Sequence, residues 1–472
     1  MNGIRTCTAV GILLGFFLLS PTGHSRPLED WRPAYEYPHP DGIPPSVYQQ
    51  RRQRALQHLG PRSALLVFAA EPRLRNGDVY YPYRQSSWLW YLTGVLEPNS
   101  VLVLSPQGIP WGERRLQELL FLPERAAARE RWEGAQMGPM EAERLLDIPA
   151  LPRAHYDSLL YLLLSQTDTL YVLAFPTPSL RLPISGEVIS TEQLERERLR
   201  NRFSQLILRQ GFPPLRRMRA EKDTAELRLL RRAIAITTAA FQRLWREAGP
   251  GIKEAELQAL LEAEFRRHGA DGPAFPTIVA AGGNACILHY TRGSRRIRDG
   301  ELVLVDCGAE YAGYAADLTR TFPINGRFSP EQRLVYEAVL EAQDSALAAC
   351  RPGVPFSTPH QRAVAVLKRR LSELGILRTP EELHRYFPHS TSHHLGLDVH
   401  DVGPIDTLRP GFVITVEPGV YIPPGSPCDQ RWWNIGVRIE DVVLITPTGS
   451  EVLSSALPRR VEELEKLLRS SR

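Results

Sequence analysis

Compact apolar runs bounded by turn residues characterise the first part of the chain. The runs "SALLVFAA" (63–70) and "SVLVLS" (100–105) are typical of buried β-strands. Before them, residues 45–60 place apolar residues at helical spacing and stop at a glycine, which predicts a helix. We therefore predict an amino-terminal α/β domain over residues 43–212.

A long helix is predicted to open the second part of the chain, over residues 225–248. Either Asp223 or Thr224 can cap its first turn. Residues 213–224 then form a linker, and a second domain occupies residues 225–472. A chain of 472 residues is too long for one ordinary core and suits two domains. The predicted fold class is α/β (α+β).

The first 25 residues have the layout of a secretory signal peptide. Arg5 gives a positive start, residues 9–19 are an unbroken run of apolar residues and glycine, and small residues follow at suitable cleavage positions. The run is shorter than the about 20 apolar residues that span a bilayer, so an uncleaved anchor is the second alternative. Residues 26–42 are rich in proline and predict an extended arm. We expect an exported protein, periplasmic or secreted, without stable membrane insertion.

Composition is that of a globular protein, with 43% apolar and 23% charged residues. The net charge is +4, and only four of the 57 basic residues are lysine. The arginines are scattered and alternate with glutamate, as in "ERAAARERWEG" (124–134). A preference for arginine over lysine explains this pattern better than a nucleic-acid surface, so we expect no nucleic-acid partner.

Four cysteines would remain after signal cleavage, and none has CxxC spacing: Cys286, Cys307, Cys350 and Cys428. Export permits disulfides, but so few cysteines in so long a chain are no disulfide framework. We expect buried free thiols at Cys286 and Cys307, and the state of the four together stays open.

Two aspartates flank a predicted hairpin in "ELVLVDCGAEYAGYAADLTRTF" (301–322). A strand ends at Asp306, a turn follows at Tyr311-Ala312-Gly313, and a second extended segment carries Asp317. Directly opposed residues of an antiparallel pair have a constant index sum, so we predict that Asp306 stands opposite Asp317 on one face. Two like charges so close are costly without a counter-ion, and a divalent metal is the simplest remedy. The alternative is that each aspartate merely ends a strand.

Two further acids occupy similar places. Glu417 ends a strand before a Pro-Gly turn, and Glu440 lies in an apolar strand two residues from Arg438. An Arg438–Glu440 pair on a solvent-facing side is the alternative interpretation. The segment "STSHHLGLDVHDVG" (390–403) adds three histidines. Oxygen-dominated sites with one imidazole favour Mn²⁺, with Co²⁺ or Zn²⁺ as alternatives, and four carboxylates balance two divalent ions.

Together these motifs resemble a known family. The ordered set comprises "LHYT" (288–291), "VDCGAEYAGYAADLTRTFP" (305–323), "SHHLGLDVHDVG" (392–403), "VEPGVY" (416–421) and "GVRIEDVV" (436–443). It is similar to that of the pita-bread metallopeptidases, and within them to the Xaa-Pro aminopeptidases (aminopeptidase P). The amino-terminal stretch "RNGDVYYPYRQSSWLWYLTG" (75–94) is also close to the aminopeptidase P pattern. The resemblance covers roughly residues 43–465 and implies a pita-bread catalytic domain over residues 225–472.

The resemblance implies two divalent metal ions per chain and five ligands: Asp306, Asp317, His393, Glu417 and Glu440. Asp317 and Glu440 would bridge the ions. Asp306 would serve one ion alone, and His393 and Glu417 the other. Glu417 would also take a proton from the water that bridges the two ions, as that water attacks the peptide carbonyl.

Other cleft positions follow from the same resemblance. His289 and His400 would line the substrate cleft and help to stabilise the tetrahedral intermediate. Arg438 would hold Asp306 in place, and His389 falls at another cleft histidine of the family.

The amino-terminal domain contributes two further positions by resemblance. Asp78 and Trp132 fall where relatives approach the bound peptide. The expected partner is a peptide with proline in second position, and we expect a homo-oligomer, a dimer or a tetramer.

The remaining polar residues of the histidine segment have no family role. His394 should point away from its neighbour His393, in a packing or surface role. Asp398 and Asp401 are interpreted as turn and capping residues. The hydroxyl cluster of residues 390–392 lacks a serine-hydrolase context.

Three functions compete at this point. The first is a dinuclear aminopeptidase that releases a residue preceding proline. The second is a prolidase, which shares the fold and ligands but accepts only Xaa-Pro dipeptides. The third is a non-enzymatic pita-bread binding protein, although such relatives usually lose ligands. Creatinase-like chemistry is disfavoured by the complete ligand set, and methionine aminopeptidase by the long amino-terminal domain.

Overall fold

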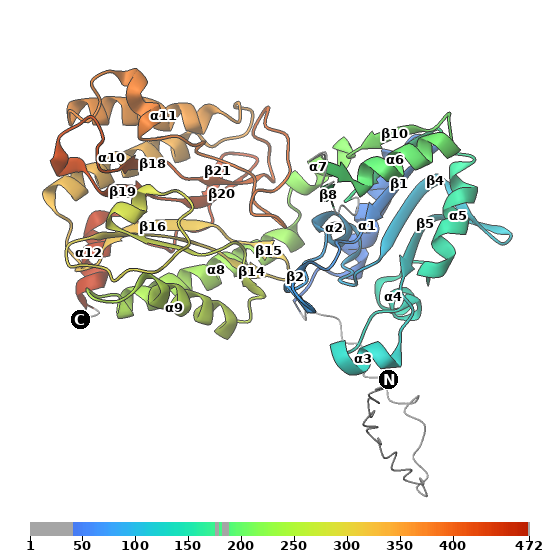
Figure 1. The fold of residues 1–472 in the computed structure, drawn as a ribbon. Helices are drawn as coiled ribbons and strands as arrows, with labels where there is room; N and C mark the ends of the chain where they lie inside the picture. Colours follow the sequence, from blue (N-terminus) through green and yellow to red (C-terminus); the bar gives the residue numbers. More distant parts are fainter. Residues whose placement is uncertain (1–40, 175–178, 182–187, 471–472) are drawn as a thin grey trace, which may run out of the picture. The chain divides into compact units, whose positions relative to one another are not determined.

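The computed structural model of the protein describes residues 41–174, 179–181 and 188–470 (Figure 1). The predicted signal peptide and nearly all of the predicted arm lie outside the described residues. The chain divides into two compact units, residues 1–36 with 125–136 and residues 37–124 with 137–472. The described part of the first unit contains helix α3 (Ala127–Glu133), and every other described element belongs to the second unit.

A six-stranded mixed sheet organises the amino-terminal half of the second unit. Its strand order is β10-β7-β1-β4-β5-β6, and the strands are β1 (Ser63–Phe68), β4 (Val101–Trp111), β5 (Arg114–Leu122), β6 (Ala150–Pro152), β7 (Thr169–Leu173) and β10 (Ile207–Gln210). β1 pairs antiparallel with β4 and parallel with β7. Helix α5 (Tyr156–Leu164) buries Tyr156, Leu159 and Leu163 against the sheet, which forms the core of this half. The two strands predicted from apolar runs are thus confirmed.

Smaller elements complete this half. Helix α1 (Pro45–Gln57) confirms the helix predicted before the first strand. The remaining elements are β2 (Leu74–Asn76), β3 (Val79–Tyr80), α2 (Ser87–Thr93), α4 (Pro139–Leu146), η2 (Arg153–His155), β8 (Ser179–Arg181), β9 (Val188–Ser190) and α6 (Thr191–Arg202).

A half-buried helix lies where the linker was predicted. Helix α7 (Pro213–Ala220) buries Leu215, Met218 and Arg219. It is followed by α8 (Thr224–Glu247), whose cap is Asp223, because the Asp223 carboxylate accepts the Glu226 amide at 2.9 Å. Of the two predicted alternatives, Asp223 and Thr224, the cap is therefore Asp223. The predicted domain boundaries themselves remain a prediction.

Short antiparallel sheets build the carboxy-terminal half. They are β11 (Gly272–Pro273), β14 (Ala309–Tyr311) and β15 (Tyr314–Ala315); β12 (Ile278–Ala281), β13 (Leu302–Cys307) and β16 (Leu318–Pro323); β17 (Val413–Val416), β20 (Asp441–Ile445) and β21 (Ser450–Val452); and β18 (Gly419–Ile422) with β19 (Ile435–Arg438). The strand expected to run unbroken through Glu440 is divided, because Ile439 and Glu440 connect β19 to β20 in another sheet.

Helices cover these strands on both sides. Figure 1 shows the strands between α8 with α9 (Glu254–Arg267) and α10 (Pro330–Ala349) with α11 (Thr358–Glu373). Helix α12 (Val461–Ser470) and the short 3₁₀ helices η3 (Gly282–Cys286), η4 (Pro380–Arg385) and η5 (Gln430–Trp432) complete the half. The layered arrangement buries the strand faces, so acids that end on them are held away from water.

The hairpin that carries the two aspartates has a different register from the predicted one. Asp306 pairs with Thr319 rather than with Asp317, because the turn lies at Ala312 and Gly313. Both residues have positive φ, +48° and +79°, as a tight two-residue hairpin turn requires. Asp317 is two residues from Thr319 and so keeps to the same face. The predicted pairing of Asp306 with Asp317 was wrong by two residues, while the prediction that the two aspartates share a face was right.

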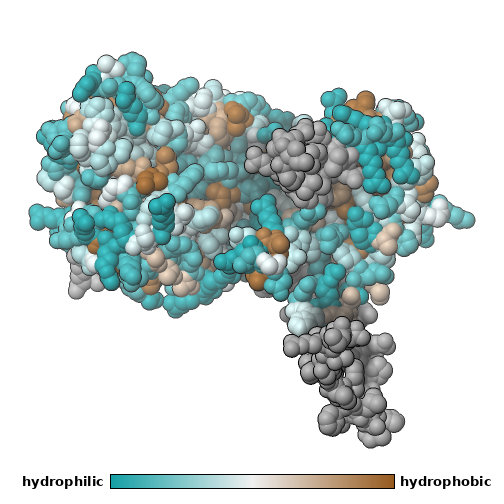
Figure 2. All heavy atoms as spheres, viewed as in Figure 1, coloured by the Kyte–Doolittle hydropathy of each residue, from teal (hydrophilic) through white to brown (hydrophobic). Residues whose placement is uncertain are grey.

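The described surface gives no sign of a membrane span. No helix among residues 41–470 that the structure describes is long and apolar enough to cross a bilayer. On the face shown in Figure 2, hydrophilic residues predominate and hydrophobic residues form small separate patches. Isolated exposed apolar side chains of this kind are ordinary for a protein surface.

Candidate metal centre

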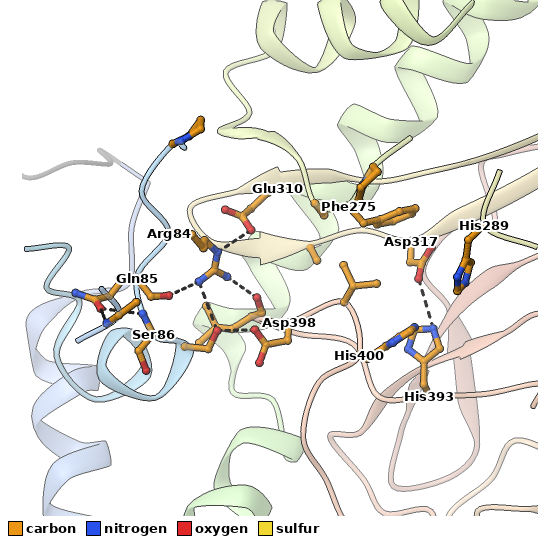
Figure 3. Close-up of a pocket in the computed structure, with 18 of the residues that line it drawn as sticks. Arg84, Gln85, Ser86, Phe275, His289, Glu310, Asp317, His393, Asp398 and His400 are labelled. Carbon is orange, nitrogen blue, oxygen red and sulfur yellow. Dashed lines mark hydrogen bonds and ion pairs between the residues drawn. The ribbon is translucent and has the colours of Figure 1, made fainter. Parts of the chain in front are cut away.

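The five predicted ligands line one cleft of the second unit: Asp306 on β13, Asp317 before β16, His393 in a loop, Glu417 after β17, and Glu440 between β19 and β20. Ligand atoms of Asp317, His393 and Glu440 all lie within 4.8 Å of one another. The His393 Nε2 atom is 3.4 Å from Asp317 Oδ2 and 3.4 Å from Glu417 Oε1 (Figure 3). Strand ends from distant parts of the chain therefore converge on one point.

The carboxylates are held at an electrostatic cost. Burial, and then the charges of Asp306 and Glu417, raise the pKa of Asp317 well above its usual range. Burial and neighbouring carboxylates likewise raise the pKa of Glu417 and of Glu440. Buried like charges favour protonation unless a cation neutralises them.

A divalent cation fits this donor set. Asp306 Oδ1 is buried and makes no hydrogen bond to any described residue. Three oxygen-donor residues with raised pKa values and an unpartnered buried oxygen are the environment that hard or borderline cations neutralise. The imidazole is oriented for the same purpose, because His393 Nδ1 contacts the His394 carbonyl at 3.0 Å and leaves Nε2 facing the acids.

Arg438 lies where the resemblance places it. Its Nη2 donates to Asp306 Oδ2 at 2.6 Å, its Nε to Thr319 Oγ at 3.1 Å and its Nη1 to the Tyr421 hydroxyl at 2.9 Å. The fully buried Arg438 thus touches one acid and orders two hydroxyls, which argues against a solvent-facing Arg438–Glu440 pair.

Two site residues were missed at the sequence level. Thr319 donates to Glu440 Oε2 at 2.7 Å, and the Tyr421 hydroxyl lies 2.9 Å from His389 Nε2. Burial raises the pKa of Tyr421 to about 12, so it stays a neutral phenol. The signal for Thr319 was its position two residues after Asp317, on the same strand face.

The cleft histidines differ in their attachment. His389 is anchored through Tyr421 and the Ser390 carbonyl, and its Nδ1 is 3.9 Å from Glu417 Oε2. His289 and His400 are exposed on the cleft wall, and the His400 ring meets the His393 ring edge-on with centroids 4.3 Å apart. Figure 3 shows His289, His393 and His400 at the same end of the cleft as Asp317.

His394 is a packing residue. It is 3% exposed, lies against the rings of Phe356 and Phe412, and holds the Pro404 carbonyl through Nε2 at 2.9 Å. The packing interpretation is therefore right and the surface interpretation wrong.

The two aspartates of the histidine segment, Asp398 and Asp401, form ion pairs in addition to the predicted turn and capping roles. Asp401 does accept its neighbour Val402 N–H at 2.9 Å, but its carboxylate is buried against Arg219 and Lys222. Asp398 accepts from Arg219 at 2.8 Å and from Ser87 at 2.6 Å. These ion pairs join segments far apart in the chain, which local turn chemistry does not reveal.

The approach of the two predicted amino-terminal residues, Asp78 and Trp132, to a bound peptide remains a prediction. Asp78 is exposed in the turn between β2 and β3 and is not among the residues that line the cleft. Trp132 is 88% exposed on α3, in the other compact unit. The cleft instead receives Arg84, Ser87 and Trp88 from this part of the chain. Arg84 donates to Glu310 at 3.0 Å (Figure 3).

The four described cysteines are free thiols; Cys307 is buried as expected, whereas Cys286, at the end of η3, is only partly buried. Burial raises the pKa of Cys286 to about 12, and that of Cys307 also rises. Neither is poised as a nucleophile.

Comparison with known proteins agrees with this geometry. Residues 228–447 match the model of metallopeptidase family M24, and residues 48–171 that of the aminopeptidase P amino-terminal domain. The Xaa-Pro aminopeptidase of Escherichia coli (strain K12) is 38% identical over 438 residues, covering 90% of this chain and 98% of the relative. This chain belongs to metallopeptidase family M24. Xaa-Pro aminopeptidase 3 of Rattus norvegicus, another relative of this M24 chain, is 33% identical over 428 residues, covering 88% of this chain and 82% of the relative.

Solved structures of the family have the same fold. Aminopeptidase P from E. coli with the inhibitor Pro-Leu superposes with a TM-score of 0.80 at 37% identity, covering 91% of this chain and 99% of that one. Zinc-substituted E. coli aminopeptidase P in complex with product gives 0.80 at 38% identity with the same coverage. The predicted two-part α/β and pita-bread fold is confirmed, and the M24 chain is a metallo-exopeptidase.

Proposed function

We propose that this M24 metallopeptidase releases the first residue from peptides whose second residue is proline, with two divalent ions per chain. The convergence of Asp306, Asp317, His393, Glu417 and Glu440 in one cleft carries the proposal. The similarity to Xaa-Pro aminopeptidases along both halves of the chain supports the proline preference.

Asp317 and Glu440 would be shared by the two ions, Asp306 would serve one, and His393 with Glu417 the other. Mn²⁺ suits four carboxylates and one imidazole best, with Co²⁺ or Zn²⁺ as alternatives. Such ions, when bound, lower the pKa of a water molecule and polarise the peptide carbonyl.

The protein's own groups complete the reaction. Glu417, whose pKa is raised by burial and by Glu440, is suited to accept the proton of the attacking water. His289 and His400, which line the cleft, would donate hydrogen bonds to the charge that develops on the carbonyl oxygen. Arg438 holds Asp306 in place through its 2.6 Å hydrogen bond.

Recognition of proline is a matter of shape. The bond before proline has no N–H, so the cleft needs no acceptor there and must admit a ring. Phe275, Pro276 and Leu288 line the cleft and give an apolar surface for that ring.

The size of the cleft favours longer peptides over a dipeptide-only prolidase. Its volume is about 2030 Å³, and its lining extends from the acids to Arg73, Leu74 and Tyr81. Pockets for small ligands are typically about 300–1,000 Å³. Turnover of an Xaa-Pro dipeptide and an Xaa-Pro-Xaa tripeptide should be compared at equal concentration. Activity confined to the dipeptide would establish a prolidase and leave the metal proposal standing.

Export and assembly complete the proposal. We expect a mature chain that begins near Arg26, which amino-terminal sequencing of the natively produced protein tests; retention of Met1 on a cytosolic protein contradicts export. We expect a dimer or tetramer, which sedimentation equilibrium of the metal-loaded protein tests, and a purely monomeric species contradicts assembly.

A further inference from the structure

His400 has no side-chain anchor of its own. Its ring makes no hydrogen bond to a described residue, and the ring of His393 is the aromatic group that it meets. Because the side chain is exposed, the backbone of residues 394–403 decides where the ring lies. Contacts that hold the backbone of this segment in place therefore also determine the position of the His400 ring.

A largely buried ion cluster contacts this segment and is called the Asp401 cluster: Arg219, Lys222, Asp398 and Asp401. Arg219 Nη2 donates to Asp398 Oδ2 at 2.8 Å and also to Asp401 Oδ1, while Lys222 Nζ donates to Asp401 Oδ2 at 2.9 Å. The side chains of Arg219, Lys222 and Asp401 are at most 1% exposed. Two cations thus pair with two carboxylates, and these carboxylates belong to residues that precede and follow His400 in the sequence.

The segment is folded tightly around the Asp401 carboxylate. A Cβ atom on Gly396 would lie 2.1 Å from Asp401 Oδ2, so the backbone passes with no room to spare. The Asp401 amide donates to the His394 carbonyl at 2.9 Å, and Val402 N–H donates to Asp401 Oδ1 at 2.9 Å. A displacement of this carboxylate would therefore move the residue that precedes it, His400.

Arg219 is the member of the cluster that spans the segment. It alone contacts both Asp398 and Asp401, whereas Lys222 contacts Asp401. Its guanidinium lies 4.4 Å from the centre of the Trp88 ring, and Ser87 donates to the other oxygen of Asp398 at 2.6 Å. Two residues of helix α2 in the amino-terminal half, Ser87 and Trp88, therefore help to hold Asp398 and the Arg219 guanidinium in place.

We propose that Arg219 is a positioning residue for His400: by bridging Asp398 and Asp401 it sets the histidine for the substrate carbonyl. The inference rests on the proposed function, because it assigns His400 the role given there. It differs from a purely structural role, since loss of Arg219 should lower turnover through His400 and leave metal binding unchanged.

A double-mutant cycle on the metal-loaded enzyme separates these roles. Arg219→Met keeps the length of the side chain and removes the fork, and we expect kcat to fall about 10- to 100-fold, the scale of a small misplacement of a reacting group. In a His400→Ala background the same change should have no further effect, because the group it positions is gone. Equal losses in both backgrounds would overturn the proposal. If Arg219→Met does not fold, Arg219→Lys carries the same cycle, because it keeps the charge but shortens the reach.

A second readout needs neither metal nor turnover. Histidine-ring nitrogen correlations of the metal-free protein should show the His400 signals, assigned with His400→Ala, shifted in the Arg219 variant, while those of His289 stay in place. Unmoved His400 signals overturn the proposal. If His400→Ala leaves kcat unchanged, the role proposed for His400 fails, and the ring signals still decide whether Arg219 positions it.

Arg231 provides the matched control. It forms a bidentate pair with Glu451 at 2.7 Å, both side chains being 45% exposed. Arg231→Met makes the same substitution at an exposed arginine–carboxylate pair that does not line the cleft, and it should leave kcat, metal content and the His400 signals unchanged. A loss of kcat in this control equal to that of Arg219→Met would also overturn the proposal.

Discussion

Asp317 and Glu440 at the metal centre and Asp401 in the Asp401 cluster are all buried, yet their pKa values move in opposite directions. At the metal centre, burial and neighbouring acids raise the pKa of Asp317 and of Glu440. In the Asp401 cluster, burial alone would raise the pKa of Asp401, but Lys222 and Arg219 bring it below its usual value.

The difference lies in the origin of the compensating charge. Asp401 finds two cations within the protein, whereas the five-residue centre has Arg438 as its hydrogen-bonded cation and leaves an Asp306 oxygen without a partner in the described structure. A buried carboxylate neutralised by the chain's own cations is part of the framework. A carboxylate group left short of positive charge is a site that an external cation completes.

The largest expected effect concerns the metal centre. Asp317→Asn should abolish full metal occupancy and lower kcat/KM by more than the roughly 10- to 100-fold typical of outer-shell changes. The metal-free variant should nevertheless unfold at a higher temperature than the metal-free parent, because one of the repelling acids is gone. Metal analysis and calorimetry of the chelated proteins measure the two effects. A fall in the unfolding temperature of the metal-free variant would break the comparison.

Asp401→Asn should behave in the opposite way. It leaves two buried cations with less negative charge, so we expect a loss of about 3–5 kcal/mol in the free energy of unfolding. Metal content should stay at the parental level. Denaturant unfolding together with metal analysis checks this expectation, and an unchanged free energy would show that the cluster is not held by charge.

The neighbouring histidines give a smaller contrast. His393→Ala should weaken metal binding with little change in the stability of the metal-free protein. His394→Ala should leave metal binding unchanged but destabilise the fold by about 2 kcal/mol or more, because a buried ring between Phe356 and Phe412 is lost. Titration calorimetry with Mn²⁺ and thermal unfolding distinguish them. Equal metal loss in both variants would mean that the ligand was assigned to the wrong histidine.

The smallest effect is expected in the dependence of stability on acidic pH, to which the Asp401 cluster contributes. The folded pKa of Asp401 lies below its unfolded value, so its stabilising contribution is complete above the unfolded pKa of about 3.9 and is lost as pH falls through the folded pKa. Asp401→Asn should therefore flatten the fall in stability below about pH 4. Unfolding curves of the metal-free parent and variant over this range provide the measurement, and identical slopes would contradict it.

Much of the fold followed from local patterns. The apolar runs at β1 and β4, the helix α1 and a cap at Asp223 or Thr224 were all recognisable because each depends on neighbouring residues. The register of the Asp306–Asp317 hairpin was misjudged by two residues, because the sequence alone did not show which residues of the Tyr-Ala-Gly turn take positive φ.

By itself the sequence determined the kinds of residue available to the centre: acids that end apolar strands, and a histidine segment between them. Only the tertiary structure decided which charges are neutralised within the protein. Arg219 and Asp401 are 182 positions apart, and Thr319 and Glu440 are 121 apart. Side-chain spacing specifies which face a residue occupies, but not which distant face it will meet. The packing of strands and helices makes that choice, so the same residue type, aspartate, became a partner of cations at 401 and a candidate metal ligand at 317.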